Sequence, residues 1–122
     1  MHALVIFAAN CERTASFYAA LLGGSPTGDD TFFTVHSDSA EVHVLRIPPE
    51  FLTGEPASVP PLPRADVALK PSFEVASLPQ ALARVEQHGG VSTDRRFSDE
   101  NYEYVDVIDN EGNVIQLRSS RS

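Results

Sequence analysis

Hydrophobic and polar positions follow the same order twice along this chain. Residues 3–8 form an unbroken apolar run, which predicts a strand covered on both faces. Apolar side chains then recur at the spacing of one helical face from residue 11 to residue 22. A second apolar run at 68–75 and a second helical pattern at 78–88 repeat this order. Each half of the chain therefore begins with a predicted strand followed by a predicted helix.

Local signals mark where these helices begin and end. Asn10 and Ser77 directly precede the helical patterns, and their side-chain oxygens can accept hydrogen bonds from free amides of the first turn. A glycine pair follows each pattern, and glycine readily adopts the left-handed conformation that ends a helix. We predict helices at 11–22 and 78–88 on these grounds.

Shorter alternating stretches after each helix predict further strands. In the first half they cover 31–37 and 41–47, joined by a tight turn. In the second half they cover 102–109 and 113–119, and Gly112 in the loop between them is expected to have a positive φ. A strand directly after each glycine pair would complete the order β-α-β-β-β in both halves. A repeat of about half the chain predicts two copies of one unit that bury their sheet faces together.

A proline-rich segment separates the two units. We place the units at 1–47 and 68–122 within one domain that spans 1–122, with a linker at 48–67. Six of the nine prolines lie in this linker and its residues show no periodicity, so we predict a stiff connection. Its length lets the second unit lie beside the first unit or beside a neighbouring chain.

Composition narrows the classes of partner. The 122 residues carry a net charge of −8, which repels phosphate backbones, so we expect no nucleic-acid partner. No apolar run reaches the roughly 18–20 residues that span a bilayer, so we expect no membrane partner. The only cysteine, Cys11, excludes an intrachain disulfide and suits a reducing, cytoplasmic location.

Two local motifs lie at opposite ends of the repeat. One is Phe17-Tyr18 followed by Leu21-Leu22-Gly23, and the other is Asp109-Asn110-Glu111-Gly112-Asn113 followed by Val114-Ile115-Gln116-Leu117. With the duplicated order of elements, they make the chain resemble the vicinal oxygen chelate superfamily, which includes glyoxalase I, bleomycin resistance proteins and extradiol dioxygenases. The resemblance covers all but the linker. It implies an α+β fold in which two curved mixed sheets surround a central cleft, and it implies a homodimer, sometimes with units exchanged between chains.

The resemblance also implies strand positions for the ligands of a divalent metal. Carried onto this sequence one at a time, these positions are Ala3, Val44, Lys70 and Gln116. Only Gln116 offers a ligand atom, and an activating metal normally has three protein ligands. We therefore predict no catalytic metal site and no cofactor, and any divalent metal would lie near Gln116. A bulge that shifts the strand register would be an alternative, because it would let His2, His43 and Gln116 converge.

The side chains that remain as candidates for binding a small molecule are Lys70, Gln116, His43, Tyr104 and Arg118. Lys70 and Arg118 are cations near the implied metal position, and they could make it a site for an anion. The alternative is that both are solvated residues at the ends of strands. Tyr104 shares a strand face with Tyr102, which suits stacking on a flat ligand as well as core or interface packing. His43 alternates with two valines, which favours a surface position. We predict that the cleft lies against Lys70 and Gln116.

Two functions follow from this reasoning. The first is a metal-independent small-molecule-binding protein of the glyoxalase and bleomycin-resistance kind. The alternative is a metal-dependent lyase, isomerase or dioxygenase of the glyoxalase kind. The sequence identifies neither the ligand nor a catalytic residue, so it leaves open whether the protein is an enzyme.

Overall fold

The computed structural model describes residues 3–48, 50, 59–64 and 68–121. Each half has the order β-α-β-β-β, as the sequence predicts. The first unit consists of β1 (Ala3–Ala8), α1 (Cys11–Leu22), β2 (Ser25–Asp29), β3 (Phe32–His36) and β4 (Glu41–Arg46). The second unit consists of β5 (Ser72–Glu74), α2 (Leu78–Gln87), β6 (Val91–Ser98), β7 (Tyr102–Ile108) and β8 (Val114–Ser120).

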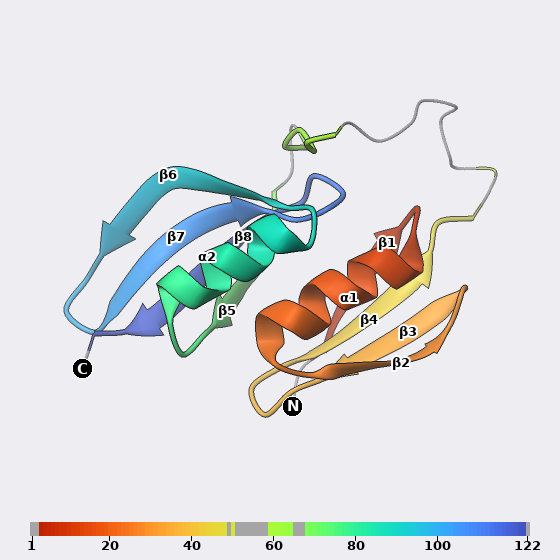
Figure 1. Ribbon diagram of the computed structural model, residues 1–122, viewed down its shortest axis with the longest axis horizontal. Helices are drawn as coiled ribbons and strands as arrows, with labels where there is room; N and C mark the ends of the chain where they lie inside the picture. The colour runs from red at the N-terminus through yellow and green to blue at the C-terminus, as the bar shows by residue number, and fades with distance from the viewer. Residues whose placement is uncertain (1–2, 49, 51–58, 65–67, 122) are drawn as a thin grey trace.

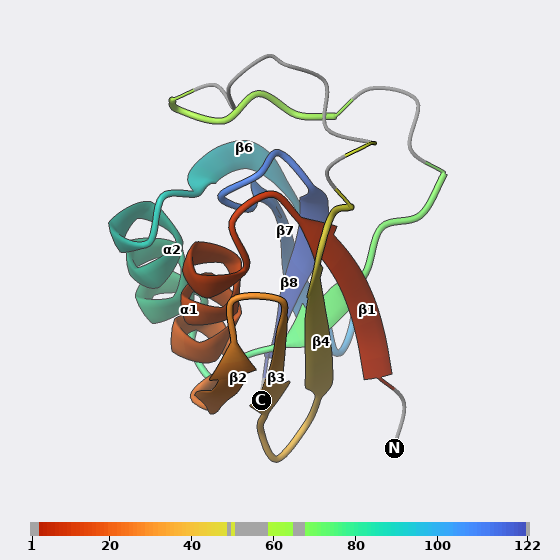
Figure 2. The same ribbon diagram turned by 90° about the vertical axis from the view of Figure 1, so that its right-hand side faces the viewer.

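Each unit forms a four-stranded mixed sheet. The strand order is β1-β4-β3-β2 in the first sheet and β5-β8-β7-β6 in the second sheet. The pairs β1/β4 and β5/β8 are parallel, and the other neighbours are antiparallel. Figure 1 shows α1 and α2 on the same side of the two sheets, and Figure 2 shows β1 on the opposite side of the molecule from α2. We call the sheet face turned away from the helices the open face.

The helices are capped as predicted. The Asn10 side chain accepts a hydrogen bond from the Arg13 amide at 3.1 Å, and α1 ends at Gly23, which has a φ of 73°. The Ser77 side chain accepts one from the Gln80 amide at 3.4 Å. None of the helices in the described ranges is long and apolar enough to cross a membrane.

The apolar positions of both units meet in one core. In the sheets its fully buried members include Val35, Val42, Val44, Val105, Val107, Ile115 and Leu117. Phe17 and Tyr18 of α1 pack edge to face with ring centroids 5.1 Å apart, and Tyr18 also meets Phe73 of the second unit at 5.9 Å. The helix-facing sides of both sheets are therefore filled, which leaves the open faces for ligands.

Polar contacts also join the units. The loop between β7 and β8 places the carboxylate of Glu111 at the start of α1, where it accepts hydrogen bonds from the amides of Ala9 (2.8 Å) and Asn10 (2.9 Å). In the same loop, buried Asp109 accepts a 2.6 Å hydrogen bond from the Tyr18 hydroxyl. Burial, followed by the nearby Asp109 carboxylate, raises the pKa of Tyr18 well above its ordinary value.

Two predictions about the first strands are wrong. Strand β1 is covered on one face only, since Val5 and Phe7 are 51% and 55% exposed; an apolar run does not reveal that its strand lies at a sheet edge. The strand expected at 68–75 shortens to Ser72–Glu74, because its pairing with β8 is limited to these three residues. The prediction of a stiff linker falls largely on residues 49, 51–58 and 65–67, which lie outside the described ranges.

Candidate functional site

The strand registers show which residues occupy equivalent places in the two units. In the second sheet Gln116 lies between Ser72 and Asp106, and in the first sheet His43 lies between Val5 and Thr34. Val5 and Ser72 both lie five residues before their helix caps, so His43 is the equivalent of Gln116.

The sequence-based match of Val44 to Gln116 is therefore wrong. Val44 is fully buried on the helix side of its sheet, as is Leu117 in the second unit. That match aligned Leu45-Arg46 with Leu117-Arg118, which is out of register by one residue. One residue along a strand reverses the face of the sheet.

A row of polar side chains crosses the open face of the second sheet. The Ser72 hydroxyl donates a hydrogen bond to Oε1 of Gln116 at 2.7 Å, and the Lys70 ammonium lies 3.0 Å from Oδ2 of Asp106. Asp106 is only 5% exposed. Its second oxygen, Oδ1, is buried and has no hydrogen-bond partner among the described residues. This row thus holds a buried carboxylate that is satisfied on one side only.

A second row on the same face is aromatic and charged. Arg118 lies opposite Tyr104, which lies opposite Phe97. The rings of Phe97 and Tyr104 stack at 4.6 Å with an interplanar angle of 12°. The Arg118 guanidinium lies 4.6 Å from the centroid of the Tyr102 ring. Its buried Nε is 3.6 Å from a Glu74 oxygen and makes no hydrogen bond within the described part of the chain.

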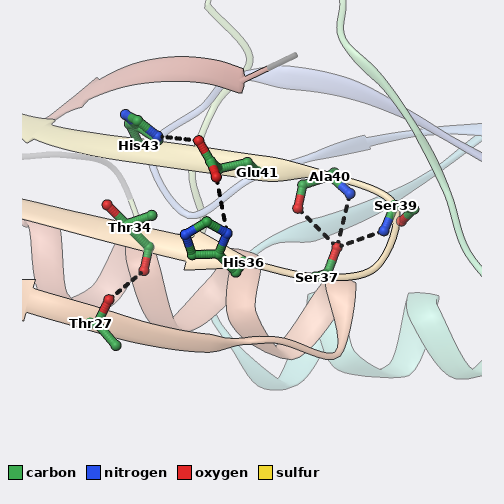
Figure 3. Close-up of polar contacts among 8 residues, drawn as sticks. All are labelled: Thr27, Thr34, His36, Ser37, Ser39, Ala40, Glu41 and His43. Atoms are coloured by element: carbon green, nitrogen blue, oxygen red, sulfur yellow. Dashed lines mark hydrogen bonds and ion pairs between the residues drawn. The ribbon is translucent and has the colours of Figure 1, made fainter. Parts of the chain in front are cut away.

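The open face of the first sheet carries a different cluster, shown in Figure 3. One oxygen of Glu41 lies 2.9 Å from Nδ1 of His36, and the other lies 2.7 Å from Nε2 of His43. The hydrogen bond from His43 lowers the pKa of Glu41, and nearby His36 adds to this effect. The sequence analysis favoured a surface position for His43 and did not connect it with Glu41. The signal was the position of Glu41, opposite His36 across the turn and two residues from His43.

The predicted site residues thus divide between two sheets. Lys70, Gln116, Tyr104 and Arg118 share the open face of the second sheet, and His43 lies on the first sheet. Asp106, to which Lys70 binds, was not among the residues predicted for the site.

Two hollows border these residues. One, of about 200 Å³, lies between the units and is lined by residues that include Phe7, Leu69 and Val114. The other, of about 270 Å³, lies beside Phe97 and Tyr104 but is also lined by Leu78 of α2, so it reaches the helix side of the second sheet. Neither is lined by Lys70 or Gln116, so a cleft against those two residues stays a prediction.

The residues present do not fit the metal that the resemblance implies. In the described ranges, no group of three or more His, Cys, Asp or Glu side chains is placed to hold a metal ion. With the corrected register the four strand positions carry Ala3, His43, Lys70 and Gln116, of which only His43 and Gln116 have ligand atoms. The pairing of β1 with β4 is unbroken, so no bulge shifts this register; His2 itself lies outside the described ranges.

Comparison with known proteins gives matches among solved structures only. No protein-family model matches this chain, and no curated protein matches it. A glyoxalase/bleomycin resistance protein from Albidiferax ferrireducens T118 is 16% identical with a TM-score of 0.70, over 98% of this chain and 97% of that chain. The fosfomycin resistance protein FosX from Mesorhizobium loti is 9% identical with a TM-score of 0.66, over 98% and 90%. A bleomycin resistance determinant encoded on transposon Tn5 is 14% identical with a TM-score of 0.62, over 100% and 98%.

These likenesses establish the fold. Two mixed sheets with a helix on each match the glyoxalase and bleomycin-resistance architecture that the sequence resemblance implies. At 9–16% identity, the likenesses carry no substrate or metal over to this chain.

Proposed function

We propose that this protein binds a small organic molecule without a catalytic metal, on the open face of its second sheet. The Lys70–Asp106 pair supports this most. At a position where the resemblance implies a metal ligand, the chain carries an ammonium group 3.0 Å from a buried carboxylate. A divalent ion there would be repelled by Lys70, and the carboxylate is already partly neutralised.

The same pair changes which cation would anchor an anionic group. Lys70 is neutralised by Asp106 at hydrogen-bond distance. Arg118 is held less tightly, because its pairing with the exposed Glu74 carboxylate is 3.6 Å long. An exposed pair of that length contributes little, so its guanidinium is available to a ligand. Arg118 is therefore the better anion anchor of the two.

We further propose that the protein is a homodimer. The edge strand β1 exposes Val5 and Phe7, and Leu69 beside them is 81% exposed. An apolar patch on an edge strand favours association with a second copy, since pairing covers both the side chains and the free backbone groups. A dimer would place a second chain beside the hollow between the units. The cytoplasm stays the expected compartment, because Cys11 is buried and free.

The metal content of the purified protein tests the central claim. Protein prepared without chelator should hold far less than one equivalent of zinc, nickel, manganese or iron, and its thermal midpoint should not change after dialysis against EDTA. A screen of aromatic and anionic compounds should raise that midpoint, because a ligand specific for the native state stabilises it. One bound equivalent of metal whose removal lowers the midpoint would contradict the proposal and favour the metal-dependent lyase, isomerase or dioxygenase.

Gln116→Glu is a useful matched variant for this test. The resemblance implies a glutamate at this position, and the variant supplies that carboxylate with little change in shape. We expect it to remain free of metal, because Lys70 and the Asp106 pairing are unchanged. If the wild-type protein did hold a metal through Gln116, the charged ligand would tighten that binding.

A further inference from the structure

The open face of the second sheet holds one unsatisfied acceptor and one unsatisfied donor. Oδ1 of Asp106 and Nε of Arg118 are both buried without a hydrogen bond among the described residues. Buried polar groups in folded proteins are nearly always hydrogen-bonded, and each exception costs free energy. A ligand that supplies a donor to Asp106 and an acceptor to Arg118 would satisfy both residues.

The sheet register sets the distance between these two ends. Asp106 lies opposite Gln116, which precedes Arg118 by two residues on β8. Two residues along a strand span about 7 Å. The polar ends of the ligand should therefore be separated by about that distance or slightly more, which corresponds to one or two fused rings.

The surface beside the line from Asp106 to Arg118 is aromatic. Tyr104 lies directly opposite Arg118, and the Phe97 ring stacked on Tyr104 is 54% exposed. An exposed stacked ring offers a flat surface to a further aromatic ring, and such contacts contribute beyond area burial.

Charge decides the direction in which the ligand lies. The acidic end belongs at Arg118, because a guanidinium binds a carboxylate with two parallel hydrogen bonds and its pairing with Glu74 is long. The donor end belongs at Asp106, which repels a carboxylate. Oδ1 is buried, so a covering side chain must move; Lys70 can do so, because it lies outside the strands and is 43% exposed.

We propose that the ligand of the second sheet is a flat aromatic acid with a hydrogen-bond donor at the far end of its ring system. This inference rests on the proposed metal-independent binding function and specifies its ligand class. Asp106, Arg118 and the Phe97–Tyr104 stack would contact the donor, the acid and the rings, respectively.

Three related probes test the two ends separately. 6-Hydroxy-2-naphthoate has both ends, 2-naphthoate lacks the hydroxyl group, and 2-naphthol lacks the acid. Their fluorescence can be followed directly because the protein contains no tryptophan. We expect the hydroxy acid to bind at least about tenfold more tightly than either partial probe, the usual scale for one charged hydrogen bond.

Substitutions at Arg118 and Asp106 test which residue contacts each polar end of the probe. Arg118→Met should weaken both acids about tenfold and leave 2-naphthol unchanged. Asp106→Asn should make the two acids bind equally, since the hydroxyl group loses its charged acceptor. Arg84→Met, on α2 and away from the open face, is the matched control and should change nothing.

The outcomes separate the ligand class from the function. Equal binding of the three probes, or no binding of any of them, overturns the proposed ligand class. The proposed metal-independent binding function would still be supported if other compounds raised the thermal midpoint. Loss of binding in Arg84→Met would also overturn the assignment. If Asp106→Asn does not fold, the wild-type ratio of the probes and the Arg118→Met result decide the matter. Stoichiometric metal would instead defeat the function itself.

Discussion

Replacing Tyr18 by phenylalanine tests the polar joint between the units. The hydroxyl group donates a 2.6 Å hydrogen bond to Oδ2 of Asp109, and both side chains are fully buried. Losing a hydrogen bond to a charged group costs about 1.5–3 kcal/mol. Oδ2 keeps the Asn113 side-chain amide at 2.8 Å, so the carboxylate is not left without a donor. We therefore expect the lower part of that range, about 1.5–2 kcal/mol.

Urea unfolding followed by circular dichroism would measure this loss. With a denaturant dependence typical of small proteins, the midpoint should fall by about 1 M at unchanged slope. Protomer concentration must be held constant, because dimerisation would shift the midpoint. The matched control is Tyr104→Phe, which removes a similar 2.8 Å bond to Asp99 on the surface. It should lower the midpoint much less than Tyr18→Phe does. Equal midpoints for both variants would refute the reasoning from burial.

Three further predictions concern the helix start, pH and association. Glu111→Ala should cost about 1–3 kcal/mol in urea unfolding, because the amides of Ala9 and Asn10, just before α1, lose a charged acceptor. Glu12→Ala, in the first turn of α1, should have little effect. Hydrogen bonds from His43 and Tyr104 lower the pKa values of Glu41 and Asp99 below their ordinary 4.5 and 3.8. Stability should therefore fall as pH drops below about 4.5 in a thermal-denaturation series, and a stability constant down to pH 2 would contradict this. Light scattering should give about twice 13.2 kDa for the wild-type protein and 13.2 kDa for Phe7→Lys; a wild-type monomer would argue against the dimer.

Elements with local signals could be predicted from the sequence. The side chains of Asn10 and Ser77 bond amides inside their own helices, so the information lies within three residues. Gly112 has the expected positive φ, of 93°, in the β7–β8 loop. Strands β2 and β6 had no alternating pattern to mark them, because most of their residues are exposed and backbone pairing with β3 and β7 holds them.

The site was harder to predict because it depends on register between distant segments. Lys70 and Asp106 are 36 residues apart, and no local pattern connects them. The assignment of Val44 instead of His43 arose from one residue of misalignment, which in a strand exchanges the buried face for the open one. The sequence showed which kinds of side chain the site contains. Which of them pair across strands could be seen only in the folded structure.

The contact of Glu111 with α1 also bears on how the chain acquires its structure. The carboxylate that completes the start of α1 lies 101 and 102 residues further along than the amides it binds. While the chain is being synthesised, the first unit can form its helix, but the amides of Ala9 and Asn10 just before it must wait for the β7–β8 loop. Contacts this distant in sequence slow folding, since a long loop must close before they form. The first unit should thus reach its final stability only after synthesis of the second, and a nascent chain stalled before Glu111 should be unusually sensitive to protease near residue 10.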